Sequence, residues 1–275
     1  MSAAEIDVLI PTRNRPVELA TTLAGLAAQD SPGFTVLVSD QSDGAPDYDT
    51  EPARTMARVL GRRGHPVCFG RHLPRRGIAE HRAHLLGIAT ARYVLFLDDD
   101  VWLEPGTVRL LHAAITELGC GMVGCAMQGL SYLDDHRPHE LAPLELWPGR
   151  VRPERVRPGT PEWQRWTLHN AANPAHLGDA VRPLLARTGR EWVAYKVAWI
   201  SGCVLFDREK LLLAGGFEFW RELPVEHAGE DVLAQRRVME RFGGAGILPS
   251  GAVHLESPTT VENREVEAYE AVGGA

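Results

Sequence analysis

The stretch Arg92-Tyr-Val-Leu-Phe-Leu-Asp98-Asp99-Asp100 places five consecutive apolar or aromatic residues, Tyr93 to Leu97, directly before three carboxylates. Because polar residues do not alternate with the apolar ones, the run predicts a strand that is buried on both faces. Three adjacent carboxylates repel one another, so a buried strand end can hold them only if a cation or hydrogen-bond donors lie nearby. Mg²⁺ or Mn²⁺ would suit, because hard cations prefer oxygen ligands. The alternative to a metal site is a solvated loop after the strand. The apolar strand in front of the acids favours the metal site over this alternative.

The composition is that of one large α/β domain, or of one domain with an elaborated lobe. The chain has 275 residues, of which 44% are hydrophobic and 24% charged, and its formal net charge is −7. No basic tract stands out, which argues against a nucleic-acid partner. The first residues do not have the basic and apolar pattern of a signal sequence, and no apolar run approaches about 18 residues. We therefore expect a cytoplasmic protein without a transmembrane segment, for which peripheral membrane contact stays open.

Strand and helix patterns alternate through the first half of the chain. Apolar runs predict strands, and the segments between them have helical periodicity. The alternation predicts βαβ units and a mostly parallel sheet flanked by helices. The expected strands are 8–10, 34–38, 67–73, 93–97 and 121–128, and the expected helices begin near Pro16, Glu51, Gly77 and Pro105.

Polar residues follow three of these strands at the point where each ends. Thr12-Arg13 follows the first, Asp40 the second, and Asp98-Asp99-Asp100 the fourth. Ligands of parallel sheets bind beyond the carboxyl ends of the strands, so these residues are expected to line one crevice. Neither a Gly-x-Gly-x-x-Gly fingerprint nor a Gly-x-x-x-x-Gly-Lys-Ser/Thr loop is present, which argues against a dinucleotide fold and excludes a P-loop.

The second half of the chain loses this regularity and then recovers it. Residues 130–192 are rich in Pro and Arg and hold four of the seven tryptophans, which is typical of an insertion or a binding lobe. Strands are expected again at 197–206, 246–248 and 252–255, and helices at 208–214 and 232–241. We therefore divide the chain into a first half (1–128), an inserted segment (129–196), a second half (197–256) and a polar, loosely held tail (257–275).

Motifs in both halves occur in an order that resembles a known family. The first half has Val8-Leu-Ile-Pro-Thr-Arg-Asn14, Val38-Ser-Asp40, Gly77 with Arg82, and Phe96-Leu-Asp-Asp-Asp100. The second has Ser201-Gly202 through Arg208, Gly215-Gly216-Phe217, and Gly229-Glu230-Asp231 with Arg237. Together they resemble the family 2 glycosyltransferases, which have the GT-A fold and use nucleotide sugars. The resemblance covers roughly residues 6–128 and 197–255. Two positions depart from the family pattern, Ala83 in place of Asn and Glu218 in place of Asp.

The resemblance implies which residues contact the nucleotide. Pro11, Thr12 and Arg13 match the segment that contacts the base and the ribose. Asp40 matches the acid that hydrogen-bonds the base, and Arg82 lies where the family has an arginine near the pyrophosphate. From the residues alone, Asp40 could equally be a turn former and Arg82 a solvated helix residue.

The resemblance also implies a metal site and a catalytic base. Asp98 and Asp99 are expected to face the nucleotide, and Asp100 to bind Mn²⁺ or Mg²⁺ together with His254. Asp231, beside Glu230, matches the catalytic base of inverting members. The alternatives are a helix cap for Glu230-Asp231 and a core position for His254.

The implied reaction is metal-dependent transfer of a sugar from a UDP- or GDP-type donor to an acceptor hydroxyl, with inversion. The acceptor, a glycan, a lipid or a small metabolite, is not indicated. A sugar-phosphate nucleotidyltransferase is one alternative, although such enzymes begin with a Gly-rich loop where this chain has Pro-Thr-Arg-Asn. A non-catalytic module that binds nucleotide sugars or glycans is the other.

Overall fold

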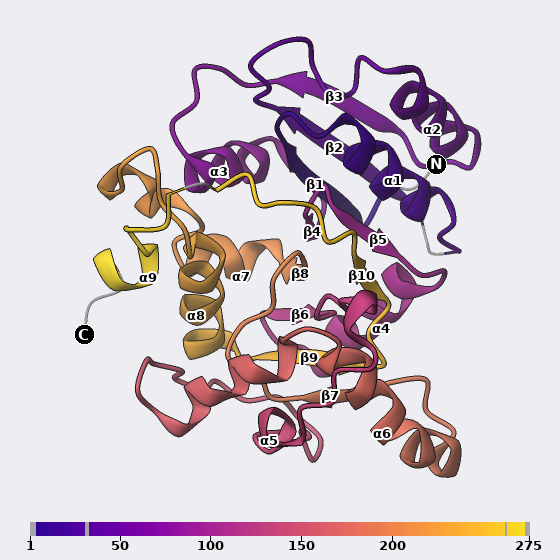
Figure 1. Cartoon of the computed structure of the whole chain (residues 1–275), viewed down its shortest axis with the longest axis vertical. Coiled ribbons are helices and arrows are strands. Elements are labelled where there is room, and N and C mark those ends of the chain that lie inside the picture. Colours follow the sequence, from indigo (N-terminus) through magenta and orange to yellow (C-terminus); the bar gives the residue numbers. More distant parts are fainter. Residues whose placement is uncertain (1–3, 31–32, 262, 273–275) are drawn as a thin grey trace.

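An eight-stranded sheet forms the centre of the molecule in the computed structural model, which describes residues 4–30, 33–261 and 263–272 (Figure 1). The strand order is β3-β2-β1-β4-β8-β6-β9-β7, and β5 and β10 form a separate two-stranded sheet. The strands are β1 Ile6–Thr12, β2 Phe34–Asp40, β3 Val67–Arg71, β4 Tyr93–Leu97, β5 Val101–Leu103, β6 Met122–Gly124, β7 Val193–Tyr195, β8 Cys203–Asp207, β9 Gly244–Leu248 and β10 Ala252–His254. The α-helices are α1 Pro16–Ala27, α2 Glu51–Arg62, α3 Ile78–Ile88, α4 Thr107–Leu118, α5 Pro138–Leu141, α6 Asn173–Thr188, α7 Arg208–Leu213, α8 Glu230–Phe242 and α9 Ala268–Ala271, and the 3₁₀ helices are η1 Leu130–Tyr132, η2 Pro161–His169 and η3 Glu218–Glu222.

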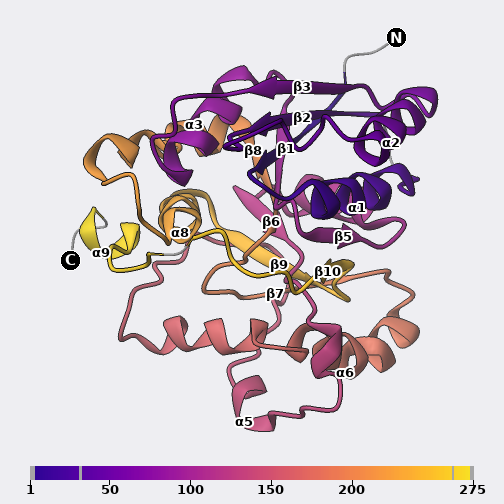
Figure 2. The same ribbon diagram turned by 45° about the horizontal axis from the view of Figure 1, so that its top comes forward.

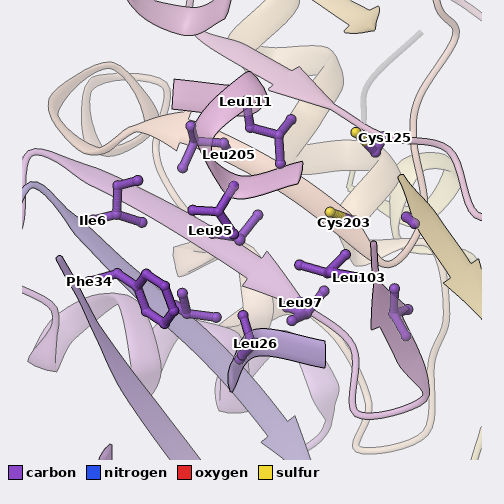
Figure 3. Close-up of a cluster of buried hydrophobic side chains, with 14 of the residues drawn as sticks. Ile6, Leu26, Phe34, Leu95, Leu97, Leu103, Leu111, Cys125, Cys203 and Leu205 are labelled. Carbon is purple, nitrogen blue, oxygen red and sulfur yellow. The ribbon is translucent and has the colours of Figure 1, made fainter. Parts of the chain in front are cut away.

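Strand β4 lies in the middle of the sheet and is buried along its whole length, as its sequence predicts. It pairs in parallel with β1 and antiparallel with β8. Its alternate side chains enter two different cores, Leu95 and Leu97 on one face, Val94 and Phe96 on the other. Figure 3 shows Leu95 and Leu97 among apolar side chains from neighbouring elements. Because both faces are covered, every position of the strand is apolar.

The sheet is mixed, and the expected class, an α/β fold with a mostly parallel sheet flanked by helices, is confirmed. The pairs β1–β2, β2–β3, β1–β4 and β6–β9 are parallel. Strand β8 runs antiparallel between β4 and β6, and β7 is antiparallel to β9. The inserted segment supplies β7 at one edge and lies on that side of the molecule with α5 and α6 (Figure 2).

Several expected strand bounds are wrong, for identifiable reasons. Strand β1 continues through Pro11 because its pairing with β4 ends at Leu9, so no ladder partner needs the missing N–H on that side. Residues 197–202 form no strand. Instead, the side-chain amide of Gln235 donates to the carbonyl of Ile200 (2.7 Å) and accepts from its N–H (2.8 Å), which satisfies that backbone without a neighbouring strand.

The tail is not loosely held where the structure describes it. The Ala228 N–H donates to the carbonyl of Val266, and the Ala268 N–H donates to the carbonyl of Ala228. Ala268, in α9, is fully buried. Figure 1 shows the segment after β10 running across the molecule to α9 beside α8. Among the described residues, no helix is long and apolar enough to cross a bilayer.

The central position of β4 makes its core side chains important for stability. Leu95→Ala removes a fully buried side chain and is expected to lower the free energy of unfolding by about 3 kcal/mol, because it leaves a cavity in a packed core. Urea denaturation measures this change. The control is Val17→Ala at a 73% exposed position of α1, where a change within about 0.5 kcal/mol is expected. Equal effects at the two positions would contradict the burial of β4.

Candidate active site

A cavity of about 610 Å³ lies beyond the carboxyl ends of β1 and β4. The first turns of α3 and α8 and residues of the tail also line it. Ten of the side chains predicted from the sequence to form the site line it, and Asp40 does not. The ten are Pro11, Thr12, Arg13, Arg82, Asp98, Asp99, Asp100, Glu230, Asp231 and His254.

The acidic triplet is compensated by donors from three distant parts of the chain. Arg15 Nη1 donates to Asp99 Oδ1 (3.0 Å) and to Asp100 Oδ2 (2.6 Å). Arg82 Nη2 donates to Asp98 Oδ1 (2.9 Å). His254 Nε2 lies 3.4 Å from Asp100 Oδ2. The requirement for cations beside these acids is therefore met by side chains of the protein itself.

Arg15 is a site residue that sequence reasoning missed. It precedes α1, its side chain is only 10% exposed, and it binds two of the three acids. Its Nη2 also donates to the carbonyl of Pro258, which connects the acidic triplet to the tail. The available signal was its position in Thr12-Arg13-Asn14-Arg15, within the polar segment that follows the first strand.

The pKa values of Asp99 and Asp100 are shifted in opposite directions because the surroundings of the two carboxyl groups differ. Burial raises the pKa of Asp99 to about 7, although Thr12 and Arg15 act in the opposite direction. Thr12 Oγ1 lies 2.7 Å from a carboxylate oxygen of Asp99 and of Asp47, and a hydroxyl has only one proton to donate. A protonated Asp99 can supply the second proton. Burial acts to raise the pKa of Asp100 as well, but the hydrogen bond with His254 and the charge of Arg15 outweigh it. The pKa of the Asp100 carboxyl is therefore lowered.

Arg82 joins the acidic triplet to the start of α8. Its Nε donates to Glu230 Oε1 (2.9 Å) while its Nη2 binds Asp98. The side chains of Arg82 and Glu230 are 8% and 7% exposed. The buried guanidinium binds both carboxylates and so fixes the position of the start of α8 relative to the acidic triplet.

Asp231 follows Glu230 in the first turn of α8 and faces the same cavity. Burial and the negative charge of Glu230 raise the pKa of Asp231 to about 7. Its Oδ1 accepts a hydrogen bond from the Val232 N–H (2.9 Å), within the first turn of the helix. A carboxyl group with a pKa near neutrality can exchange a proton with a ligand at physiological pH.

Asp40 is fully buried, and its carboxylate is used inside the protein. Oδ1 accepts from the Ser42 N–H (2.8 Å), and Oδ2 accepts from the Asp47 N–H (2.7 Å) and from Ser42 Oγ (3.1 Å). These bonds hold the loop after β2. Among the predicted site residues, Asp40 is the one that the structure does not bring to the cavity.

The described residues do not contain three His, Cys, Asp or Glu side chains arranged to hold a metal ion. The nearest arrangement is the pair of Asp100 and His254, whose facing atoms are 3.4 Å apart. Their hydrogen bond raises the pKa of His254.

An α/β sheet of this topology, with acids at the end of its central strand, is the GT-A architecture of glycosyltransferases. The model of the family described as Glycosyl transferase family 2 matches residues 7–175, and the chain belongs to this family. No curated protein matches the chain.

Solved structures share the fold at low sequence identity. The mannosyltransferase PcManGT from Pyrobaculum calidifontis, in complex with GDP-Man and Mn²⁺, is 16% identical with a TM-score of 0.56, over 95% of this chain and 59% of that one. TarS 1–349 from S. aureus is 17% identical with a TM-score of 0.54, over 91% and 60%. The same protein in complex with UDP-GlcNAc gives 17% and 0.54, over 94% and 60%. This chain therefore spans about three fifths of the length of these structures.

The ion pairs of Arg82 are expected to be important for stability as well as for the site. Arg82→Met leaves two carboxylates without their cation, one of them buried, and should lower the free energy of unfolding by about 3 kcal/mol in chemical denaturation. The matched control is Arg182→Met, which breaks a pair whose side chains are 78% and 70% exposed and should have no measurable effect. An Arg82 variant as stable as the control would show that the pairs with Asp98 and Glu230 are not formed.

Proposed function

We propose that this chain transfers a sugar from a nucleoside diphosphate sugar to an acceptor hydroxyl with inversion. The observation that carries the proposal is the meeting, in one cavity, of the acidic triplet after β4 and Asp231 at the start of α8. The family supports the reaction class. The complexes of structural relatives with GDP-Man and UDP-GlcNAc support a GDP- or UDP-type donor.

Arginines on the cavity wall suit a diphosphate. Arg13, Arg15, Arg75 and Arg82 all line it. Guanidinium groups bind phosphate oxygens through charge-assisted hydrogen bonds. In this proposal Pro11, Thr12 and Arg13 contact the nucleoside, and Asp98 and Asp99 lie against the ribose.

Asp100 and His254 are the residues that would hold Mn²⁺ or Mg²⁺. Their facing oxygen and nitrogen are close enough to share one ion, since ligand distances are about 2.1 Å. Two protein ligands suffice where phosphates supply the others, so the lack of a third ligand among the described residues fits this arrangement. When bound, such an ion acts as a Lewis acid on the departing diphosphate. The guanidinium of Arg15 places a second positive charge beside Asp100.

Asp231 is the proposed general base. As the acceptor hydroxyl attacks the anomeric carbon, the Asp231 carboxylate takes its proton. A single base opposite the leaving group gives direct displacement and inversion. Glu230 is held by Arg82 and positions the first turn of α8. The raised pKa of Asp231 makes its carboxylate a stronger base than an exposed aspartate.

Trp199 and Tyr269 form an aromatic part of the cavity wall. The ring of Trp163 packs between them, with ring centroids 4.7 Å from Trp199 and 5.4 Å from Tyr269. Trp163, which belongs to the inserted segment, therefore packs against both aromatic residues of the cavity wall. The faces of such rings suit the apolar face of a sugar or another cyclic acceptor.

Donor cleavage in the absence of an acceptor tests the reaction class. Wild-type protein with UDP-GlcNAc or GDP-mannose should release nucleotide slowly with Mn²⁺ and much more slowly after chelation. Asp100→Ala should lower the Mn²⁺-dependent rate at least ~100-fold, because the ion loses a ligand. The control is Asp134→Ala, an exposed acid that does not line the cavity. Wild-type rates in the Asp100 variant would refute the role of Asp100.

The role of Asp231 predicts a defined pH dependence. A base with a pKa of about 7 becomes protonated as the pH falls, so transfer should slow below about pH 7. Asp231→Asn should still bind the donor, lose about 10²–10⁴-fold in transfer, and lose this acid limb. Steady-state rates from pH 5 to 9, together with donor binding by calorimetry, measure both effects. Glu240→Gln, at an exposed position of the same helix, is the control and should keep the wild-type profile. Normal turnover in Asp231→Asn would refute the assignment.

A further inference from the structure

A strip of arginines runs along α8, outside the cavity that holds the acidic triplet. We call it the basic strip, and it consists of Arg150, Arg152, Arg155, Arg157 and Arg236. The first four lie within residues 149–158, which contain a single acid, Glu154, although the formal net charge of the whole chain is −7. The fifth belongs to α8 itself. None of these described side chains lines the cavity.

The segment 149–158 presents its arginines on a restricted backbone. It repeats the tripeptide Val-Arg-Pro, at 151–153 and again at 156–158. Both valines are buried. Arg152 and Arg157 each precede a proline, which restricts the backbone of the preceding residue to extended conformations. Arg152 is exposed and Arg157 is partly exposed, so the repeat anchors its valines in the protein and directs its arginines to solvent.

Contacts with α8 set the direction of the basic strip. The Glu154 N–H donates to the carbonyl of Met239, in the last turns of the helix (3.1 Å). Two residues further along the segment, the carbonyl of Val156 accepts from Arg236 Nε, one turn closer to the start of the helix (2.8 Å). The segment therefore follows α8 backwards, toward the turn that carries Asp231. The 13 residues of α8 span about 20 Å, at about 1.5 Å per residue.

The basic strip ends at the aromatic wall of the cavity. The guanidinium of Arg236 lies over the ring of Trp163, 5.8 Å from its centroid. Trp163 packs against Trp199 and Tyr269, and these two residues line the cavity. A ligand that lies along the strip therefore reaches the cavity beside the start of α8, where Asp231 is.

The positive charge of the basic strip is only partly neutralised. Glu154 is turned toward the protein, where it accepts from the buried Arg165 (2.6 Å). Arg155 pairs with Glu240 (3.0 Å), but the two side chains are 58% and 49% exposed, and such surface pairs contribute little. The other three arginines of the segment form no ion pair with any residue that the structure describes, and Nη1 of Arg236 has no hydrogen-bond partner among those residues.

We propose that the basic strip binds an anionic oligomer and leads it to the cavity, so that the acceptor carries repeated phosphate or carboxylate groups; its role as acceptor rests on the proposed function. Guanidinium groups bind both kinds of anion through charge-assisted hydrogen bonds. Arginines that repeat over about 20 Å suit an oligomer with repeated charges better than one small anion. An anionic membrane suits the strip less, because the valines of the segment are buried and leave no apolar side chain to enter lipid.

Calorimetric titration at several salt concentrations, without donor and without Mn²⁺, measures binding to the strip. The probes are linear polyphosphate, oligogalacturonate as a carboxylate oligomer, the neutral methyl ester of that oligogalacturonate, and orthophosphate. We expect the wild-type protein to bind one of the two anionic oligomers much more tightly than the methyl ester or orthophosphate. The tighter of the two identifies the charged group that the strip prefers.

The strip variant combines Arg152→Gln, Arg155→Gln and Arg157→Gln. Its affinity for the preferred oligomer should fall at least ~10-fold, and the slope of log affinity against log salt should decrease by about 2, because each lost contact with an anion removes about 0.7–0.9 from that slope. The matched control combines Arg182→Gln, Arg187→Gln and Arg190→Gln, which remove the same charge from exposed positions in and just after α6. This control should bind as the wild type does, and both variants should keep the wild-type melting temperature.

The inference is overturned if the wild-type protein binds neither oligomer, if the strip variant keeps the wild-type affinity, or if the control loses as much affinity as the strip variant. Tighter binding to vesicles that contain phosphatidylglycerol than to either oligomer would also overturn it, in favour of a membrane. Donor cleavage by the same protein separates this inference from the proposed function. A protein that cleaves the donor but binds neither oligomer contradicts this inference alone. A protein that binds an oligomer through the strip but cleaves no nucleotide sugar contradicts the proposed function, and the binding surface stands.

Discussion

The arrangement of this protein depends on balancing three carboxylates at the end of its central strand. Asp98, Asp99 and Asp100 follow a strand buried on both faces, where unpaired charges would be strongly unfavourable. Arg15, the residue before α1, and Arg82, in α3, form ion pairs with them. The requirement for compensation therefore brings together α1, α3 and the triplet, and the same groups leave a polar cavity beside it.

The two halves of the fold are joined by polar contacts as well as by the sheet. Arg82 bridges Asp98 to Glu230, and Gln235 pairs with the backbone of Ile200. Both contacts end on α8, the helix that also presents Asp231. Consequently, the position of the proposed base is coupled to the position of the proposed donor site, although the two are far apart in the chain. Arg15 extends the same network to the tail through the carbonyl of Pro258.

The long periodic elements were predicted well, and several of the short ones were not. Strand β4 has the bounds that its apolar run indicates, and α1 buries the expected Leu19, Leu23 and Leu26. Strand β5 has three residues, too few to show a period, and was not predicted, whereas the strand expected at 252–255 is present as β10. The antiparallel pairing of β5 with β10 joins segments that are far apart in the chain, and no local pattern indicates it. The tail was expected to be loose because its composition is polar. Its attachment uses backbone groups, which composition does not reveal.

The sequence by itself determined the α/β class, the buried central strand and the set of acids, because hydrophobic runs and charged strand ends are local properties. It also indicated the family through the order of its motifs. Only the tertiary structure decided how those side chains are used. Arg15 faces the triplet, and the carboxylate of Asp40 is used up inside its loop. Such roles depend on which hydrogen-bond partners folding brings within reach, and those partners come from residues distant in the chain.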